Sequence, residues 1–374
     1  MQTEIFAINI LVFILPAIYL GLTLGLIIAT FYGERKLSSF IQDRLGPMEV
    51  GPYGALQFIA DLMKMIQKED IIPTGANRFL FKLAPLFIFI VVFAGFAFVP
   101  LAPGVLPIAS NVGVFFCLTI ISLDVMGLLM AGWATENKFA LLGAMRAAAQ
   151  IVSYEIPVGI CVLSVIVISG TMDLGEIAMQ QSIWNEGKTW FLGIKQLGIE
   201  TTSWGGIFAW NILQSPFMFV VYIIYYISTL AECNRAPFDL PEAESELVAG
   251  YHAEYSGIRF GIFFLAEYAM MVLVSLLGAV LFLGGWSTPF PNIGSVELAN
   301  WTSGTQGTWS SIAWGICWIS IKTLIPCLAM VWIRWTFPRL RTDQLMYLCW
   351  KVLIPFSIGA FLLVSIGKYF LLVG

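Results

Sequence analysis

Long uninterrupted runs of apolar residues, each about 20 residues long, alternate along the chain with shorter polar connections. This length suits a helix that crosses a bilayer, whereas a barrel strand needs only about 9–11 residues. Backbone groups in lipid must be satisfied internally, so the runs are predicted to be helical. The expected spans cover residues 7–32, 79–99, 112–134, 150–169, 207–230, 262–285, 311–333 and 347–372. The predicted fold class is all-α, with about eight transmembrane helices in a single membrane domain over residues 1–374.

Lysine and arginine are distributed unevenly among the connections, and this asymmetry predicts the orientation in the membrane. Connections after even-numbered spans hold only Lys188 and Lys195, whereas those after odd-numbered spans hold many cations. By the positive-inside rule the cation-rich connections face the cytoplasm and both termini face the outer side. The cytoplasmic loops so defined include residues 33–78, 231–259 and 334–346. The long outer connections, 172–206 and 287–310, are expected to be peripheral caps or partner contacts.

The first cytoplasmic loop contains an amphipathic segment over residues 53–69. Its residues Leu56, Ile59, Met63 and Ile66 recur at helical spacing, and polar residues lie off this stripe. The segment is too short and too charged to span the bilayer, so it is expected to lie at the cytoplasmic membrane interface. Two interpretations follow: a membrane-surface strut, or a helix whose polar face walls a cavity that admits an amphiphile from the bilayer.

Charge is scarce in this chain, because only 11% of residues are charged, and yet it is concentrated in one place. Within this chain the stretch 231–254, called the acidic loop below, sets six carboxylates against the single cation Arg235, namely Glu232, Asp239, Glu242, Glu244, Glu246 and Glu254. Further ionisable residues fall within predicted spans, namely Asp124, Glu155, Glu267 and Lys322. A group at that depth must face a partner or a wet cavity. Neighbouring carboxyls resist simultaneous ionisation and can exchange protons near neutral pH, so the pattern predicts proton handling.

A structural role is the alternative for several of these residues. Asp239 and Glu242 have the spacing of a capping box that opens a short helix. A hydrogen-bonded carboxyl at Asp124 can fix helix packing, and Lys322 can balance a carboxylate. His252 is interpreted as a polar helix residue rather than a ligand. Both roles therefore stay open for Asp124 and Lys322.

The remaining composition excludes several function classes. The six cysteines have no metal-ligand spacing and are predicted to be small buried apolar residues. A single histidine excludes a histidine-based metal cluster. The sequence has no Gly-rich phosphate loop, no Ser/His/Asp arrangement and no basic patch for nucleic acid. Neither a metal site nor a nucleic-acid partner is expected.

Three blocks of sequence, together with Gly33-Glu-Arg-Lys36, resemble one known family. They are Gly54-Ala-Leu-Gln57 continuing through Glu69, Pro237-Phe-Asp-Leu-Pro-Glu-Ala-Glu-Ser-Glu246 continuing to Gly250, and Arg334-Trp-Thr-Phe-Pro-Arg-Leu-Arg-Thr-Asp-Gln-Leu345. With a similarity that runs nearly end to end, the chain resembles the NuoH/ND1 family, the quinone-chamber membrane subunit of respiratory complex I (NADH:quinone oxidoreductase).

The resemblance implies a subunit of a proton-translocating NADH:quinone oxidoreductase that forms the entrance and wall of the quinone chamber. The wall residues implied are Arg35, Asp61, Arg339 and Arg341. A glutamate-lined path toward the antiporter-like subunits is implied at Glu155, Glu232, Glu242, Glu244, Glu246, Glu254 and Glu267. The substrate is then a quinone, ubiquinone or menaquinone, with no cofactor bound permanently by this chain.

The resemblance also implies partners and a location. The partners are the peripheral-arm subunits that hold the quinone site and the terminal iron–sulfur cluster, the small membrane subunits that link to the antiporter-like subunits, and the lipid bilayer. Because the sequence shows no targeting segment, the expected location is a bacterial plasma (inner) membrane, and the alternative is an organelle-encoded subunit, which would look similar. Two features depart from the family: a longer outer connection between the fourth and fifth spans, and Glu49, where a polar or basic residue is usual.

Two other function classes compete with this interpretation. A stand-alone carrier or channel is expected to show paired, glycine-broken spans, and none is present. A membrane anchor for a hydrogenase-type arm, without quinone chemistry, is a second possibility. Retention of Arg35, Asp61 and the block from Pro237 to Gly250 argues against it.

Overall fold

The computed structural model describes residues 2–185, 187, 190, 192, 201, 204–240, 248–292 and 297–373. Apart from isolated bridge residues such as Ala102 and Val105, regular structure in these residues is helical, which confirms the predicted all-α class. The longer helices are α1 (Gln2–Ile41), α2 (Gln57–Gln67), α3 (Arg78–Phe96), α4 (Gly113–Ser122), α5 (Asp124–Ala134), α6 (Lys138–Ser169), α8 (Pro216–Glu232), α10 (Gly257–Phe282), α12 (Trp309–Thr336) and α14 (Ile354–Val373). The short elements are α7 (Leu174–Gln180), α11 (Leu298–Ser303), α13 (Thr342–Tyr347), a π-helical turn (Leu348–Leu353) that joins α13 to α14, and four 3₁₀ turns (Pro52–Gly54, Gly206–Ala209, Asn211–Leu213 and Gly250–His252).

Seven stretches of the described chain are helical, long and apolar enough to cross a membrane. They are Pro16–Ile41, Arg78–Phe96, Gly113–Ala134, Lys138–Ser169, Gly257–Phe282, Trp309–Thr336 and Thr342–Tyr369. The remaining predicted span corresponds to α8, which is apolar but only 17 residues long. The multi-pass architecture expected from the sequence is thus confirmed.

Several predicted helix boundaries were wrong. The span predicted from residue 207 contains two 3₁₀ turns, and its helix starts only at Pro216, after an extended Ser215. Proline lacks a backbone N–H and disfavours helical geometry in the residue before it, so it suits a helix start and not a helix interior. Helix α6 starts at Lys138, far ahead of the predicted residue 150, because the Asn137 side chain caps it by accepting from the Phe139 N–H.

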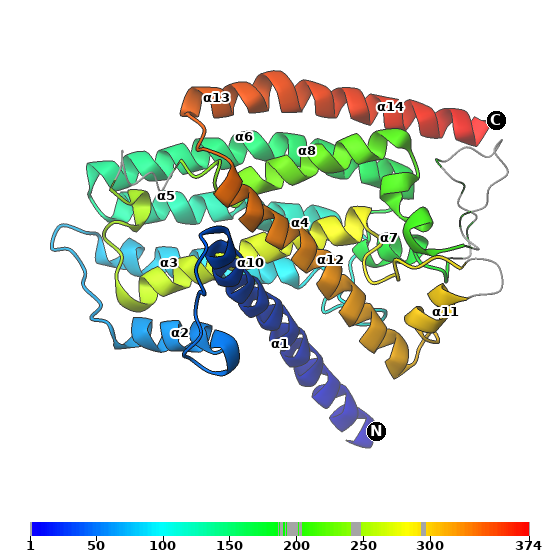
Figure 1. Cartoon of the computed structure of the whole chain (residues 1–374), viewed down its shortest axis with the longest axis horizontal. Helices are drawn as coiled ribbons and strands as arrows, with labels where there is room; N and C mark the ends of the chain where they lie inside the picture. Colours follow the sequence, from blue (N-terminus) through cyan, green and yellow to red (C-terminus); the bar gives the residue numbers. More distant parts are fainter. Residues whose placement is uncertain are drawn as a thin grey trace.

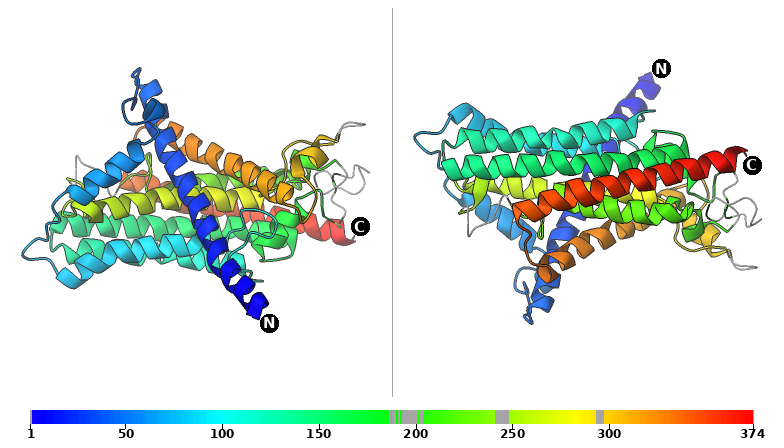
Figure 2. Two further views of the ribbon diagram at one scale, coloured as in Figure 1. Left: turned by 90° about the horizontal axis from the view of Figure 1, so that it is seen from below. Right: turned by 90° about the horizontal axis from the view of Figure 1, so that it is seen from above.

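Helix α10 is the centre of the molecule. Every residue from Tyr268 to Phe282 is buried, and α10 contacts α1, α2, α3, α8 and α12. Figure 1 shows α3, α5, α6, α8 and α10 running side by side, with α14 along the outside and α1 and α12 crossing them obliquely. The two views of Figure 2 show α1 projecting from this bundle at its N-terminal end. Residues on α10 can therefore face several helices at once.

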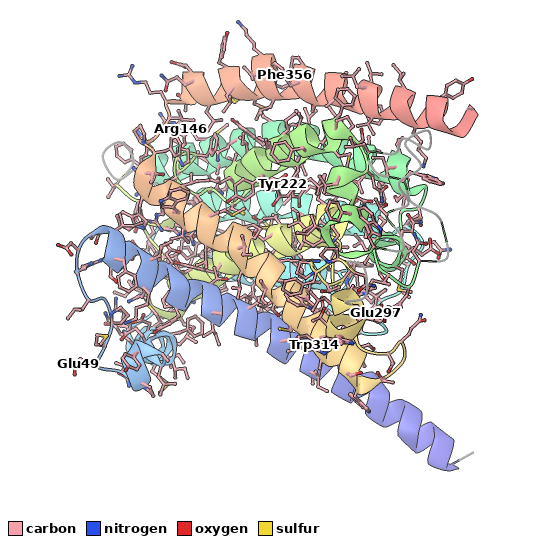
Figure 3. The ribbon with its side chains drawn as sticks, turned by 45° about the vertical axis from the view of Figure 1, so that its right-hand side comes forward. Glu49, Arg146, Tyr222, Glu297, Trp314 and Phe356 are labelled. Atoms are coloured by element: carbon pink, nitrogen blue, oxygen red, sulfur yellow. The ribbon has the colours of Figure 1, made fainter. Side chains whose placement is uncertain are left out.

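The polar connections gather at two opposite ends of the bundle. At one end, hydrogen bonds join connections that are far apart in sequence, such as Asn77 N–H to Ala134 O (3.0 Å) and Leu340 N–H to Pro237 O (3.1 Å). Figure 3 shows Glu49 and Arg146 at this end and Glu297 at the other. The cation-rich connections thus share one end, as their alternation along the chain predicts.

Lys322 and the cysteines show how polar and small groups are accommodated inside the bundle. The Lys322 side chain is 5% exposed, and its Nζ donates to Gly285 O at 3.0 Å and to Ser287 O at 2.6 Å. Its Nζ also lies 4.2 Å from the centre of the Trp210 ring. The cation therefore fixes the connection after α10, and no ion pair balances it in the part of the chain described. Five cysteines are buried as predicted, but Cys317 is exposed.

Replacing Lys322 with methionine is expected to destabilise this region. The change leaves two carbonyl oxygens without their donor, and each buried unsatisfied group costs about 1–3 kcal/mol. The measurement is the temperature at which detergent-solubilised protein loses its native fluorescence, with the exposed Lys351 changed to methionine as control. An unchanged temperature for Lys322→Met would contradict the anchoring role.

Candidate functional site

A cavity of about 270 Å³ lies between α1, α2 and α10, and we call it the α2 cavity. Its walls are mostly aromatic and aliphatic, with charged groups from α1 and α2. The lining residues are Phe31, Arg35, Phe58, Asp61, Leu62, Lys64, Met65, Phe260, Gly261, Phe264, Leu265 and Tyr268. A largely apolar pocket with a few placed polar groups suits a ligand that has a polar end and an apolar body.

One ion pair supplies most of the polarity of the α2 cavity. Arg35 Nη2 lies 2.8 Å from Asp61 Oδ2, and Gln57 Nε2 donates to the other carboxylate oxygen of Asp61 at 3.1 Å. The Arg35 guanidinium also lies 4.6 Å from the centre of the Phe31 ring. Both charged side chains are only partly buried, so they can exchange this contact for one to a ligand.

The two faces of α2 have different surroundings. The predicted apolar stripe, represented by Ile59, Met63 and Ile66, is exposed. The opposite face, with Phe58 and Leu62, lines the cavity together with the charged residues. The structure supports the interpretation of this helix as a cavity wall, with the difference that the wall is mixed rather than purely polar.

A second, much smaller cavity of about 20 Å³ lies on another side of α10, and we call it the acidic cavity. Three of its lining residues are carboxylic acids from three helices: Asp124 of α5, Glu232 of α8 and Glu267 of α10. The other lining residues are Ile88, Leu128, Cys233, Asn234, Tyr251, Phe263, Ala266 and Met270. Its volume is enough for about one water molecule.

Glu267 is held by groups from the turn that precedes α10. Tyr251 donates from its hydroxyl to Glu267 Oε1 at 3.1 Å, and His252 Nε2 lies 3.1 Å from the same oxygen. His252 is buried in a 3₁₀ turn. The prediction that it is a polar helix residue agrees with this short 3₁₀ helix, and the structure adds that its ring nitrogen contacts a carboxylate.

A charge cluster of the buried residues Glu34, Arg235 and Tyr268 and the partly exposed Arg334 lies next to the α2 cavity. Glu34 Oε1 is 3.3 Å from Arg235 Nη1 and 2.5 Å from Arg334 Nη1, and the Tyr268 hydroxyl donates to Glu34 Oε2 at 2.6 Å. The Arg235 guanidinium stacks 4.4 Å from the Tyr268 ring centre, and its side chain is only 8% exposed. This cluster ties α1 and α12 to the segment after α8.

The charge of Arg235 acts on both sides of α10. Burial by itself would lower the pKa of Arg235, but the negative charge of Glu34, followed by Tyr268 and Glu267, raises that pKa well above its usual value. Tyr268 lines the α2 cavity, and its neighbour Glu267 lines the acidic cavity. Arg235 is therefore a buried positive charge whose negative neighbours include a lining residue of each cavity.

The structure separates the predicted quinone-binding residues into two groups. Arg35 and Asp61 line the α2 cavity. Arg339 instead pairs with Asp239 at 2.8 Å, and Arg341 is the exposed residue that precedes α13. Neither of these arginines lines the α2 cavity.

The predicted path residues are likewise dispersed. Glu232 and Glu267 share the acidic cavity, whereas Glu155 is half-buried on α6 and does not line it. Glu254 accepts from Asn137 Nδ2 at 2.8 Å, near the start of α6. Glu242, Glu244, Glu246 and the short helix predicted from Asp239 onward lie outside the described residues.

Sequence reasoning assigned no role to Glu34, Tyr268 or Arg334 and left the role of Asp124 open. Arg235 was noticed only as the single cation of an acidic loop. The sequence feature that could have indicated them is a charged residue at the end of an apolar run, as in Glu34 and Arg334. Such a residue commonly marks the membrane boundary, and nothing local distinguishes a buried ion pair from that ordinary case.

Comparison with known proteins identifies relatives along almost the whole chain. A family model described as NADH dehydrogenase matches residues 13–365. The second H-type subunit of NADH-quinone oxidoreductase from Cytophaga hutchinsonii is 56% identical over 354 residues, which cover 93% of this chain and 96% of that protein. The H-type subunit from Chlorobaculum parvum is 48% identical, over 90% of this chain and 86% of the relative, and that from Bacteroides thetaiotaomicron is 44% identical, over 91% and 86%. The chain therefore belongs to the NADH dehydrogenase family that includes the H-type subunits of NADH-quinone oxidoreductases.

Proposed function

We propose that this chain forms the entrance and one wall of the quinone chamber in a proton-translocating NADH:quinone oxidoreductase. It also carries the carboxylate path that couples quinone reduction to proton translocation. The observation that supports this most directly is a pair of chemically different cavities, both lined by α10, with the Arg235 cluster next to them. One cavity suits an amphiphile, and the other suits protons and water.

The α2 cavity has the chemistry that a quinone needs. Aromatic and aliphatic walls accommodate an isoprenoid tail, while Arg35 and Asp61 offer a donor and an acceptor to the ring oxygens. The exposed apolar face of α2 supports its placement at the bilayer interface. A ubiquinone or menaquinone would then enter from the lipid rather than from water, and Arg339 and Arg341 would act closer to the docked peripheral arm.

The charge cluster provides the step that links the chemistry to the path. Electrons reach the quinone from an iron–sulfur cluster of a partner subunit, and the reduced ring carries negative charge until protons arrive. That charge attracts Arg235 and repels Glu34, which lie 3.3 Å apart. Moving the positive charge away from Glu267 favours protonation of Glu267. A proton can then continue through Glu232 and Glu155 and through the acidic loop.

The two ends of the bundle fit this assignment. The cation-rich connections and the acidic loop share one end, which would face the cytoplasm of a bacterial cell. Peripheral-arm subunits would dock there, and small membrane subunits would continue the path toward the antiporter-like subunits. Both termini would then lie on the outer side of the plasma membrane.

The test replaces Glu232 with glutamine in the complete complex in native membranes. Glutamine keeps the shape of the side chain but cannot carry a proton. Inhibitor-sensitive quinone reduction and NADH-driven proton pumping should therefore both fall by about fivefold, which is less than the rate factor that a positioned proton-transfer group usually contributes. Glu297→Gln, at the opposite end and exposed, is the matched control. A native gel establishes that the complex assembles.

Wild-type rates of quinone reduction and proton pumping in an assembled Glu232→Gln complex would contradict the proposed path. Proton transport by the purified chain alone would favour a stand-alone carrier. Normal assembly with no quinone reductase activity even in the wild type would favour a membrane anchor. Each competing interpretation therefore has its own observable outcome.

A further inference from the structure

Asp124, the first residue of α5, is a buried carboxyl that the path described above does not use. Its side chain is 9% exposed, and its Oδ1 atom has no hydrogen-bond partner in the described part of the chain. The structure records no ion pair for it there either. A carboxyl kept inside a membrane domain without a protein partner requires a proton or a water molecule.

The backbone near Asp124 departs from a continuous helix. The predicted span is divided at Leu123 into α4 and α5. Two hydrogen bonds of the tighter i to i+3 type replace the regular pattern, from Leu123 N–H to Ile120 O and from Met126 N–H to Leu123 O, both at 3.1 Å. Such an interruption inside a membrane helix often accompanies a functional position. Here it places a carboxyl at the first position of the following helix.

Asp124 shares the acidic cavity with Glu232 and Glu267. Three carboxyls around a space of about 20 Å³ cannot all carry negative charge without strong repulsion. Tyr251 and His252 both bond to Glu267, through its Oε1 atom. Within the described residues Asp124 Oδ1 has no such donor, and its side chain faces the space that one water molecule can fill.

We propose that Asp124 is a further proton-holding residue, which exchanges protons with Glu232 and Glu267 through a water molecule in the acidic cavity. In this step the O–H bond of a protonated Asp124 breaks as its proton passes to the water. At the same time the water releases a different proton to the carboxylate of Glu232. The water is regenerated, and no oxidant or reductant takes part. The inference rests on the proposed function and extends its path to α5.

Every group around the acidic cavity bears on the expected pH dependence. Helix α8 and the residue after it contribute Glu232 and Cys233, and the turn before α10 contributes Tyr251 and His252. Helix α10 contributes Glu267, while α3 and the second turn of α5 contribute the apolar Ile88 and Leu128. The charges of Arg235 and Glu155 act from outside the cavity on Glu267 and Glu232 respectively.

The test uses the complete complex in native membranes with Asp124→Asn and Asp124→Glu. Asparagine cannot hold the proton, so the number of protons pumped per NADH should fall about twofold to threefold, and the pH profile of pumping should change. Glutamate keeps a carboxyl and should retain most of the pumping. Redox-induced infrared difference spectra should lose one carboxyl band in Asp124→Asn. Oxidation of NADH by ferricyanide normalises each preparation to assembled complex.

The outcomes separate this inference from the proposed function. Full pumping and an unchanged infrared spectrum in Asp124→Asn, with Glu232→Gln impaired, would overturn the role of Asp124 alone. Full pumping in both variants would overturn the whole carboxylate path. If Asp124→Asn does not assemble, the infrared measurement is made on Asp124→Glu, where a carboxyl band must shift. An unshifted spectrum there would also reject the inference.

Discussion

Replacing Arg235 with methionine is expected to prevent stable assembly of the complex and to abolish its quinone reductase activity. The change removes the cation from a buried pair and leaves Glu34 with only Arg334 and Tyr268 among the described residues. Breaking a buried ion pair on one side costs about 3–5 kcal/mol. That loss is comparable to a large part of the stability of a typical protein, about 5–15 kcal/mol. The measurement is the amount of complex on a native gel, together with its quinone reductase rate.

A matched control and a compensating variant make this prediction specific. Arg78, an exposed arginine at the start of α3, should tolerate methionine with little effect. Removing both charges, with Arg235→Gln and Glu34→Gln combined, should restore more assembly than Arg235→Gln alone, because the buried Glu34 carboxylate no longer lacks its buried cation. Arg334 also loses its partner in the double variant, but its side chain is 37% exposed and can be solvated. If the double variant is no better than the single, the two side chains act independently and the cluster is not a unit.

Narrowing the α2 cavity is expected to slow quinone reduction without affecting electron transfer from NADH into the complex. Leu62 lines the cavity from α2, so a tryptophan there would occupy space that the quinone requires. Overpacking costs about 1–3 kcal/mol, which corresponds to a loss of roughly fivefold to 150-fold in apparent quinone affinity. The measurement is the quinone concentration dependence of the reductase rate, with ferricyanide reduction as a reference that does not depend on this cavity.

Helix α2 offers its own control for this prediction. Ile59 is on the same helix but on its exposed face. Tryptophan at that position should leave the quinone dependence unchanged and is compatible with a membrane interface, where tryptophan is common. Equal losses of apparent quinone affinity in Leu62→Trp and Ile59→Trp would mean that the whole helix is sensitive to a large side chain. The α2 cavity would then not be the site that binds the quinone.

The α2 cavity and the Arg235 cluster are successive parts of one proposed mechanism. The α2 cavity would receive the quinone, and the Arg235 cluster would detect its charge. Arg235 is suited to that task because its charge acts on Glu34 beside one cavity and on Glu267 beside the other. A guanidinium keeps its charge at any physiological pH, so it can transmit an electrostatic change by moving while its protonation stays constant.

The order of membrane spans and the class of protein are determined by local sequence. Hydropathy over about 20 residues decides whether a helix can cross a bilayer, and this property belongs to each segment alone. The amphipathic helix around Asp61 was predictable for the same reason, because its periodicity is local. The helix starts at Pro216 and Lys138 also depend on local chemistry, a proline in one case and an asparagine cap in the other. Both signals are present in the sequence itself.

The pairing of charges was decided only by the tertiary structure. Glu34 meets Arg235 across 201 residues of sequence and Arg334 across 300, and no periodicity encodes which partner a buried charge will find. The same holds for Asp124, whose role depends on whether its helix turns it toward Glu232 and Glu267 or toward lipid. Burial of an ionisable group is costly enough that it must face a partner or a water-filled cavity. The sequence therefore determined that these residues needed a partner or a wet cavity, and only the packing around α10 decided what each of them faces.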